Sequence, residues 1–203
     1  MIKAVIFDFG GVIVRTEDDS LRRAWDQRLG LPPGSVERAI HYSDLWVQAQ
    51  LGRVTYQAYW DGVAEMLRMR PADIPSLRQD YFSGDRLNYR LVTVMRELKE
   101  RGCQIALLSN EVSQLRLKLR ELDIDGLFDH ILISAETGVM KPDPTAYRVA
   151  LQALNAAPYE AVFVDDSLVN IRGAQQLGVH TILFRADTDL RAELARLFED
   201  TAS

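Results

Sequence analysis

The sequence predicts an α/β fold: a doubly wound, Rossmann-like parallel sheet of about five strands, with a helical cap domain inserted after the first strand. Two observations predict the sheet. Short apolar runs recur along the chain, and amphipathic helical patterns that end near glycine lie between them. A third observation predicts the insertion, because helical patterns follow one another from about residue 16 to residue 83 without a convincing strand.

The predicted strands are partly β-branched and lack clean alternation, which is typical of strands covered on both faces. They are the runs AVIFDF (4–9), CQIALLSN (103–110), HILISA (130–135), AVFVDD (161–166) and HTILFR (180–185). The predicted helices of the core are 86–100, 112–122, 144–154, 168–177 and 190–198. Because strands and helices alternate, we expect a parallel sheet that binds ligands at the carboxyl ends of its strands.

The inserted region contains helical patterns at 20–29, 36–51, 56–69 and 74–82, and the segments GLPPG, LGRVT and MRPADIP separate them. The predicted domains are a core of residues 1–15 and 84–203 and a helical cap of residues 16–83. The alternative is that these helices decorate the core domain. An insertion directly after a strand that ends in a carboxylate favours a lid over a site.

The net charge, the cysteine count and the apolar runs of the sequence narrow the classes of protein to which this chain belongs. The chain has 203 residues and a formal net charge of −5, which argues against a nucleic-acid-binding surface. Its single cysteine, Cys103, has no partner for an internal disulfide and fits a reducing compartment. Asp8 interrupts the only apolar run near the N-terminus, and no run approaches the ~20 apolar residues that span a bilayer. We expect a cytoplasmic protein without a membrane segment, and its oligomeric state stays open.

Polar side chains stand at or just after the ends of the predicted strands. They are Asp8, Ser109, Asn110, Lys141, Asp165 and Asp166. Each alone has a structural alternative as a helix cap or a solvated loop residue. Together they suit phosphoryl transfer, since cationic and hydrogen-bonding groups bind phosphoryl oxygens and carboxylates bind Mg²⁺. A carboxylate can also act as the nucleophile and form an aspartyl-phosphate intermediate.

Four motifs in this order, FDFGGV, LLSN, GVMKPDP and VFVDDS, resemble those of the haloacid dehalogenase-like hydrolases. The insertion after the first strand is similar to that family's helical C1 cap. The segments DFGGV, LGRVT and SAETGVMKPDPTAY resemble the branch that contains sugar-phosphate phosphatases such as α-glucose-1-phosphatase.

The resemblance implies that Asp8 is the nucleophile that attacks phosphorus. It implies that Ser109 and the backbone of Asn110 bind the phosphoryl oxygens, and that Lys141 neutralises both the nucleophile and the phosphate. The family resemblance implies a small phosphorylated metabolite as the substrate, and the branch resemblance implies a sugar phosphate.

The resemblance also implies an Mg²⁺ site. Asp8, the backbone carbonyl of Gly10 and Asp166 are the implied ligands, with Asp165 nearby as a ligand or behind the ligands. Asn170, one helical turn beyond the acid pair, is implied to orient the water molecules of the metal.

Gly10 departs from the family pattern. Most phosphatases of this family carry a second Asp there, which protonates the leaving group. Family dehalogenases and phosphonatases also lack it, so those reactions stay open. The acid pair points to Mg²⁺, which hydrolytic dehalogenases do not use, and the cap has no lysine for the Schiff base of a phosphonatase. The substitute donor we consider is Asp18, with a helix-capping role as the alternative.

Two other classes of protein remain as alternatives. A phospho-acceptor receiver domain uses similar residues but is shorter and places its acid pair at the first strand. A catalytically idle binding protein of the same fold would tolerate Gly10. In the cap, the candidates for facing the site are His41, Trp46, Arg53 and Tyr56, and the alternative for each is packing.

Overall fold

The computed structural model describes residues 1–201, and within them the core is a parallel five-stranded sheet. The strand order is β5 (His130–Ile133), β4 (Gln104–Ser109), β1 (Ala4–Phe7), β6 (Ala161–Asp165) and β7 (His180–Leu183). The chain builds outward from β1 through β4 to β5 and then crosses to the other side of β1. The predicted α/β class and the predicted strands are confirmed, and the reversal beside β1 is where such sheets bind ligands.

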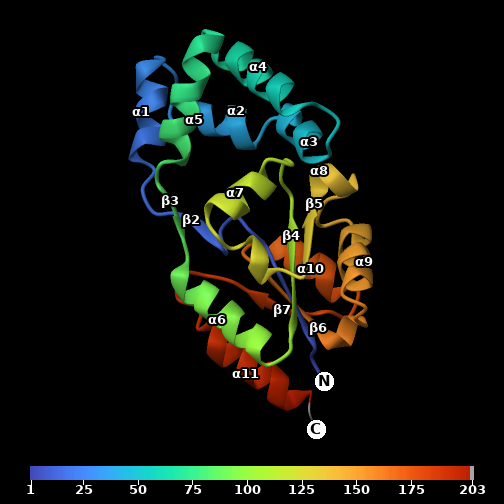
Figure 1. The fold of residues 1–203 in the computed structure, drawn as a ribbon. Coiled ribbons are helices and arrows are strands. Elements are labelled where there is room, and N and C mark those ends of the chain that lie inside the picture. The colour runs from blue at the N-terminus through green and yellow to red at the C-terminus, as the bar shows by residue number, and fades with distance from the viewer. Residues whose placement is uncertain (202–203) are drawn as a thin grey trace.

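Helices cover both faces of the sheet (Figure 1). On one face pack α6 (Tyr89–Glu100), α7 (Leu115–Glu121) and α11 (Leu190–Asp200); on the other pack α9 (Pro144–Ala153) and α10 (Leu168–Gln175). Short turns complete the core: η2 (Asp125–Leu127), α8 (Ser134–Thr137) and η3 (Pro158–Glu160). Val5 and Phe7 of β1 enter one buried core and Ala4 and Ile6 the other, because successive side chains of a strand point to opposite faces. Across residues 1–201, every helix falls short of the length and apolar character that a bilayer crossing demands.

A second group of helices lies between β2 (Val14–Thr16) and β3 (Asp85–Leu87), which pair antiparallel. They are α1 (Ser20–Arg28), α2 (Ser35–His41), α3 (Asp44–Gln50), α4 (Tyr56–Leu67), η1 (Pro71–Asp73) and α5 (Ile74–Phe82). These helices have their own buried cluster, which includes Trp25, Ile40, Tyr59, Leu77 and Tyr81. Figure 1 shows them gathered at the top of the view, beyond the sheet, with β2 and β3 forming the connection.

Three of the predicted helices differ clearly from the observed ones. The predicted helix 36–51 is broken, because the Ser43 hydroxyl accepts a hydrogen bond from Trp46 N at 3.2 Å and starts α3 afresh. The predicted helix 86–100 begins only at Tyr89, since residues 85–87 form β3 and Asn88 caps the helix. The predicted helix 112–122 begins at Leu115, and Val112 instead packs into the cluster of the second helical group.

Candidate active site

A buried ion-pair cluster lies at the carboxyl ends of β1 and β6. Lys141 Nζ donates to Asp8 Oδ1 at 2.8 Å and to Asp165 Oδ2 at 2.7 Å. Lys141 is 2% exposed, Asp8 8% and Asp165 0%. Burial lowers the pKa of Lys141, but the two carboxylates outweigh burial and the pKa is raised. Lys141 is therefore a fixed cation in contact with Asp8.

Asp8 directly follows the last residue of β1, and its backbone N–H donates to Val164 O at 3.0 Å. Burial raises the pKa of the Asp8 carboxyl to about 6; Lys141 opposes this shift and Asp165 adds to it. With Asp166 next to Asp165 in the chain, three carboxylates stand against one ammonium group. The cluster thus has an excess of negative charge that a bound cation would balance.

Asp165 faces the interior. Its Oδ1 accepts a hydrogen bond from Ser167 N at 2.7 Å, and its Oδ2 is the oxygen bound by Lys141. Asn170 Nδ2 donates to the same carboxylate at 3.1 and 3.2 Å. These donors engage both oxygens of Asp165 and hold its carboxylate against Lys141 and Asn170. The Asn170 side chain points at this carboxylate.

The cluster contains the donor atoms that a divalent cation needs. Asp8, Asp165 and Asp166 each offer a carboxylate oxygen, and these oxygens lie within 4.8 Å of one another. Burial raises the pKa of Asp166, and the charge of Asp165 adds to the shift. All of the available donors are oxygens, which suits Mg²⁺ and not a soft metal. The carboxylates of Asp8 and Asp166 fit the ion, and Gly10, two residues after Asp8, lines the adjoining cavity.

The glycines after Asp8 differ in what they allow. Gly11 has φ +76°, and a Cβ there would lie 2.0 Å from Asp166 Oδ2, so the close approach of this loop to Asp166 requires glycine. A Cβ at Gly10 would meet no atom within 4 Å. Hydrogen bonds from Gly11 N to Val14 O (2.8 Å) and from Val14 N to Phe9 O (3.0 Å) fix the loop. Steric crowding therefore does not explain why this chain lacks a second acid at position 10.

Ser109 ends the neighbouring strand β4, and Asn110 directly follows it. Ser109 is buried at the edge of the site. The Asn110 side chain donates to Lys141 O at 2.7 Å and accepts from Lys141 N at 2.8 Å, so it fixes the backbone that carries the lysine. Asn110 O accepts a hydrogen bond of 2.6 Å from Gln50 Nε2 of α3, which ties the second helical group to the site.

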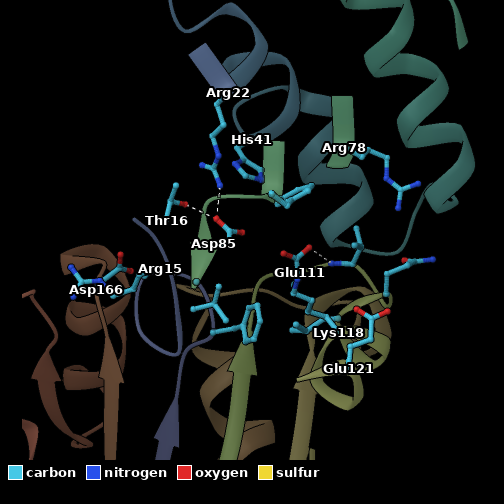
Figure 2. Close-up of a pocket in the computed structure, with 18 of the residues that line it drawn as sticks. Arg15, Thr16, Arg22, His41, Arg78, Asp85, Glu111, Lys118, Glu121 and Asp166 are labelled. Atoms are coloured by element: carbon cyan, nitrogen blue, oxygen red, sulfur yellow. Dashed lines mark hydrogen bonds and ion pairs between the residues drawn. The ribbon is translucent and has the colours of Figure 1, made fainter. Parts of the chain in front are cut away.

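A cavity of about 820 Å³ opens between this cluster and helices of the second group. Its cationic lining consists of Arg15, Arg22, Arg78, Lys118 and Arg185. Arg22 is paired with Asp85 at 2.8 Å. Arg78 forms no ion pair within residues 1–201; its guanidinium lies 4.8 Å from the ring centroid of Tyr56 and donates to the Tyr56 hydroxyl at 2.5 Å. Figure 2 shows Asp166 and Arg78 toward opposite sides of the view, with Glu111 between them.

Two of the four cap residues named as candidates for facing the site line the cavity. His41 and Tyr56 line the cavity, and burial lowers the pKa of His41 to about 4, so this imidazole is neutral near pH 7. Trp46 and Arg53 do not line it, and for Trp46 the packing alternative holds. Trp46 packs against His41 with ring centroids 5.4 Å apart, and Arg53 is exposed.

The candidate proton donor also changes. Asp18 is exposed and lies outside the cavity; its Oδ1 accepts from Ser20 N at 2.8 Å, and hydrogen bonds from Ser20 lower its pKa. The capping alternative therefore holds for Asp18. Glu111, which was not among the predicted site residues, lines the cavity, and burial raises its pKa to about 7. Its position directly after Ser109 and Asn110 places it near the site, but no sequence pattern marks it as buried.

Several known proteins are similar in sequence. Sesquiterpene phosphatase astK of Aspergillus oryzae is 28% identical over 178 residues, 87% of this chain and 87% of that protein. Phosphoserine phosphatase of Thermus thermophilus is 41% identical over 99 residues, 48% of this chain and 39% of that protein. Acyl-CoA dehydrogenase family member 10 of Mus musculus is 28% identical over 191 residues, which cover 89% of this chain. This chain spans only 18% of the mouse protein and 38% of drimenol cyclase drtB of Aspergillus calidoustus.

Solved structures share the fold. HAD family enzyme bt-2542 of Bacteroides thetaiotaomicron, in complex with magnesium and inorganic phosphate, superposes with a TM-score of 0.77 at 21% identity over 95% of this chain and 99% of that one. L-2-haloacid dehalogenase of Xanthobacter autotrophicus superposes with a TM-score of 0.68 at 21% identity, over 100% of this chain and 85% of that one. The model of the haloacid dehalogenase-like hydrolase family matches residues 2–178. The chain therefore belongs to the haloacid dehalogenase-like hydrolases.

Proposed function

We propose that this hydrolase is an Mg²⁺-dependent phosphatase that acts on a small phosphorylated metabolite through an aspartyl-phosphate intermediate. The observation that carries the proposal is the contact of Asp8 with Lys141 at 2.8 Å, beside carboxylate oxygens that can hold a cation. The named phosphatases among the relatives and the magnesium and phosphate bound by a structural neighbour support it. Asp8, Gly10 and Asp166 are the proposed metal ligands, and Asp165 supports them from behind.

In this mechanism Asp8 attacks phosphorus, and the bond from phosphorus to the leaving oxygen breaks as the aspartyl phosphate forms. Lys141 holds Asp8 in place and donates to the phosphoryl group, while Ser109 and the Asn110 backbone N–H bind its other oxygens. The metal, when bound, would neutralise phosphoryl charge. Water then hydrolyses the acyl phosphate and restores the Asp8 carboxylate.

The second helical group is the proposed cap, residues 16–83. Its separate buried cluster, its paired connection through β2 and β3, and its position over the cavity support this role. A cap that closes over the site excludes water from the reacting groups and supplies the contacts that select the substrate. Branch resemblance supports a sugar phosphate as the substrate, with α-glucose 1-phosphate as the first compound to test.

A dehalogenase is the second candidate, because a structural neighbour is an L-2-haloacid dehalogenase and Gly10 removes the second acid. The acid pair Asp165–Asp166 favours the phosphatase. A catalytically idle binding protein is the third candidate, but the retained contacts of Asp8 with Lys141 argue against it.

Turnover of p-nitrophenyl phosphate with Mg²⁺ is the expected result, and EDTA is expected to abolish it reversibly because the phosphoryl charge is then left unscreened. Phosphate release measures the reaction, and re-addition of Mg²⁺ restores it. Chloride release from 2-chloropropionate without phosphate release would favour the dehalogenase. Metal-independent release of phosphate would contradict the Mg²⁺ site.

The Arg78→Gln substitution is expected to weaken binding of the metabolite that a substrate screen ranks first. Arg78 faces the cavity without an ion-pair partner in residues 1–201, and a hydrogen bond to a charged group contributes about 1.5–3 kcal/mol, or roughly 10- to 150-fold in KM. The KM for that metabolite should rise far more than the KM for p-nitrophenyl phosphate. Arg53→Gln, outside the cavity, is the matched control; equal effects of both variants would remove Arg78 from the binding site.

A further inference from the structure

When a phosphate ester is hydrolysed, the oxygen of the leaving group needs a proton if the alcohol that departs is a weak acid. In this chain Gly10 has no side chain to supply that proton, and Asp18 lies outside the cavity. The donor must reach the leaving oxygen from a surface of the same cavity. This inference rests on the proposed phosphatase function and asks which group completes it.

The carboxyl groups that line the cavity are Asp85, Glu111, Glu121 and Asp166. Asp85 is committed to Arg22 at 2.8 Å and to the Thr16 hydroxyl at 2.8 Å, and Asp166 is a proposed metal ligand. Glu121 is exposed to solvent at the end of α7, so it is not held in the interior of the cavity. Glu111 is the remaining carboxyl group in this lining.

The position of Glu111 is fixed by its backbone. Glu111 N donates to Ser134 Oγ at 3.0 Å, and Glu111 O accepts from Ala135 N at 3.2 Å. One side-chain oxygen, Oε1, accepts from Val112 N at 2.8 Å, and no hydrogen bond within residues 1–201 engages Oε2. Figure 2 shows the Glu111 carboxyl in the middle of the cavity, pointing up from the core toward the helices of the cap, with its bond to Val112 dashed.

The surroundings of Glu111 favour its protonated form near neutral pH. Burial raises its pKa to about 7; the Val112 N–H opposes this, and the charge of Asp8 adds to it. Burial raises the pKa of nearby Tyr59 of α4, and any negative charge on Glu111 adds to this shift, so Tyr59 stays a neutral hydroxyl. A carboxyl group held in this way is matched to general acid catalysis at physiological pH.

We infer that Glu111 is the general acid of this enzyme. As Asp8 attacks and the bond from phosphorus to the leaving oxygen breaks, the proton of the Glu111 carboxyl passes to that oxygen and the alcohol departs. The Glu111 carboxylate then takes a proton from the water that attacks the aspartyl phosphate. Phosphate is released, and Asp8 is again a carboxylate and Glu111 again a carboxylic acid, so no other reactant is needed.

The test is the dependence of kcat/KM on the leaving-group pKa across aryl and alkyl phosphates at saturating Mg²⁺. Wild-type enzyme should show a shallow dependence. Glu111→Gln keeps size and the Val112 contact but cannot transfer the proton, so alkyl phosphates should lose about 10²–10⁴-fold while p-nitrophenyl phosphate loses far less. Glu121→Gln, another carboxyl of the same cavity, is the matched control and should keep the wild-type slope.

A Glu111→Gln variant with the wild-type slope, or with equal losses for aryl and alkyl phosphates, would overturn the inference. Wild-type enzyme that fails to hydrolyse p-nitrophenyl phosphate with Mg²⁺ would instead overturn the proposed function. Glu111→Asp gives a second check on folding, since it retains the acid on a shorter arm. Glu111→Asp should retain more activity than Glu111→Gln on alkyl phosphates, and the reverse order would count against proton transfer.

Discussion

Asp8→Asn is expected to lower kcat by about 10⁶-fold, the loss typical of removing a catalytic nucleophile. The amide retains the shape of the carboxylate and an oxygen that accepts from Lys141, but it cannot form the bond to phosphorus. Acid quenching during turnover should trap a phosphorylated protein in the wild type and none in the variant. Substantial turnover by a folded Asp8→Asn protein would contradict covalent catalysis.

The same variant should keep the fold. Burial raises the pKa of Asp8 from 3.8 to about 6, so the folded protein holds this proton more tightly than the unfolded chain does. The charged carboxylate therefore costs stability, and this cost grows as the pH rises from about 4 to about 6 and stays constant above. Asparagine removes it, so at pH 8 in EDTA the Tm of Asp8→Asn should not fall below that of the wild type. A lower Tm would mean that the ion pair with Lys141 stabilises the folded protein by more than the burial of the Asp8 charge destabilises it.

The sheet and the convergence of its polar residues were predictable from the sequence. Short apolar runs separated by helical patterns predict parallel strands, and parallel strands bring Asp8, Ser109 and Asp165 to one edge. The pair β2 and β3 was not predictable, since each strand has three residues and they pair across about seventy positions of chain. Such short strands carry too few side chains for a period to show.

Only the structure shows which residue of the acid pair, Asp165 or Asp166, faces the interior. The resemblance implies that Asp166 binds the metal, but it leaves open whether Asp165 is a ligand or stands behind the ligands. Which of them faces inward depends on the positions of Lys141 and Ser167, and these donors meet Asp165. Glu111 was hidden for a related reason: its burial arises from packing between the core and the cap, which no local pattern encodes.

Lys141→Met is expected to lower the free energy of unfolding by about 3–5 kcal/mol, the cost of removing one partner from a buried ion pair. Methionine fills the space of the lysine stem, but Asp165, which is 0% exposed, then lacks its counter-charge and stands beside Asp8. Urea unfolding in EDTA measures the change without a contribution from bound metal. Turnover should also be lost, because Asp8 and the phosphoryl group lose their cation.

A double-mutant cycle separates two contributions to this loss of stability: the unpaired charge of Asp165 and the lost packing of the lysine side chain. Lys141→Met combined with Asp165→Asn should recover much of the stability, since the amide needs no counter-charge and still accepts from Ser167 N. Turnover should stay lost in the double variant, because the cation beside Asp8 is still missing. Lys99→Met serves as the control for removing a lysine: its partner Asp129 is about one-third exposed, and an exposed pair contributes about 0–1 kcal/mol. A loss of stability at Lys141 no larger than that at Lys99, or a double variant no more stable than Lys141→Met alone, would contradict the view that Lys141 holds this site together by charge.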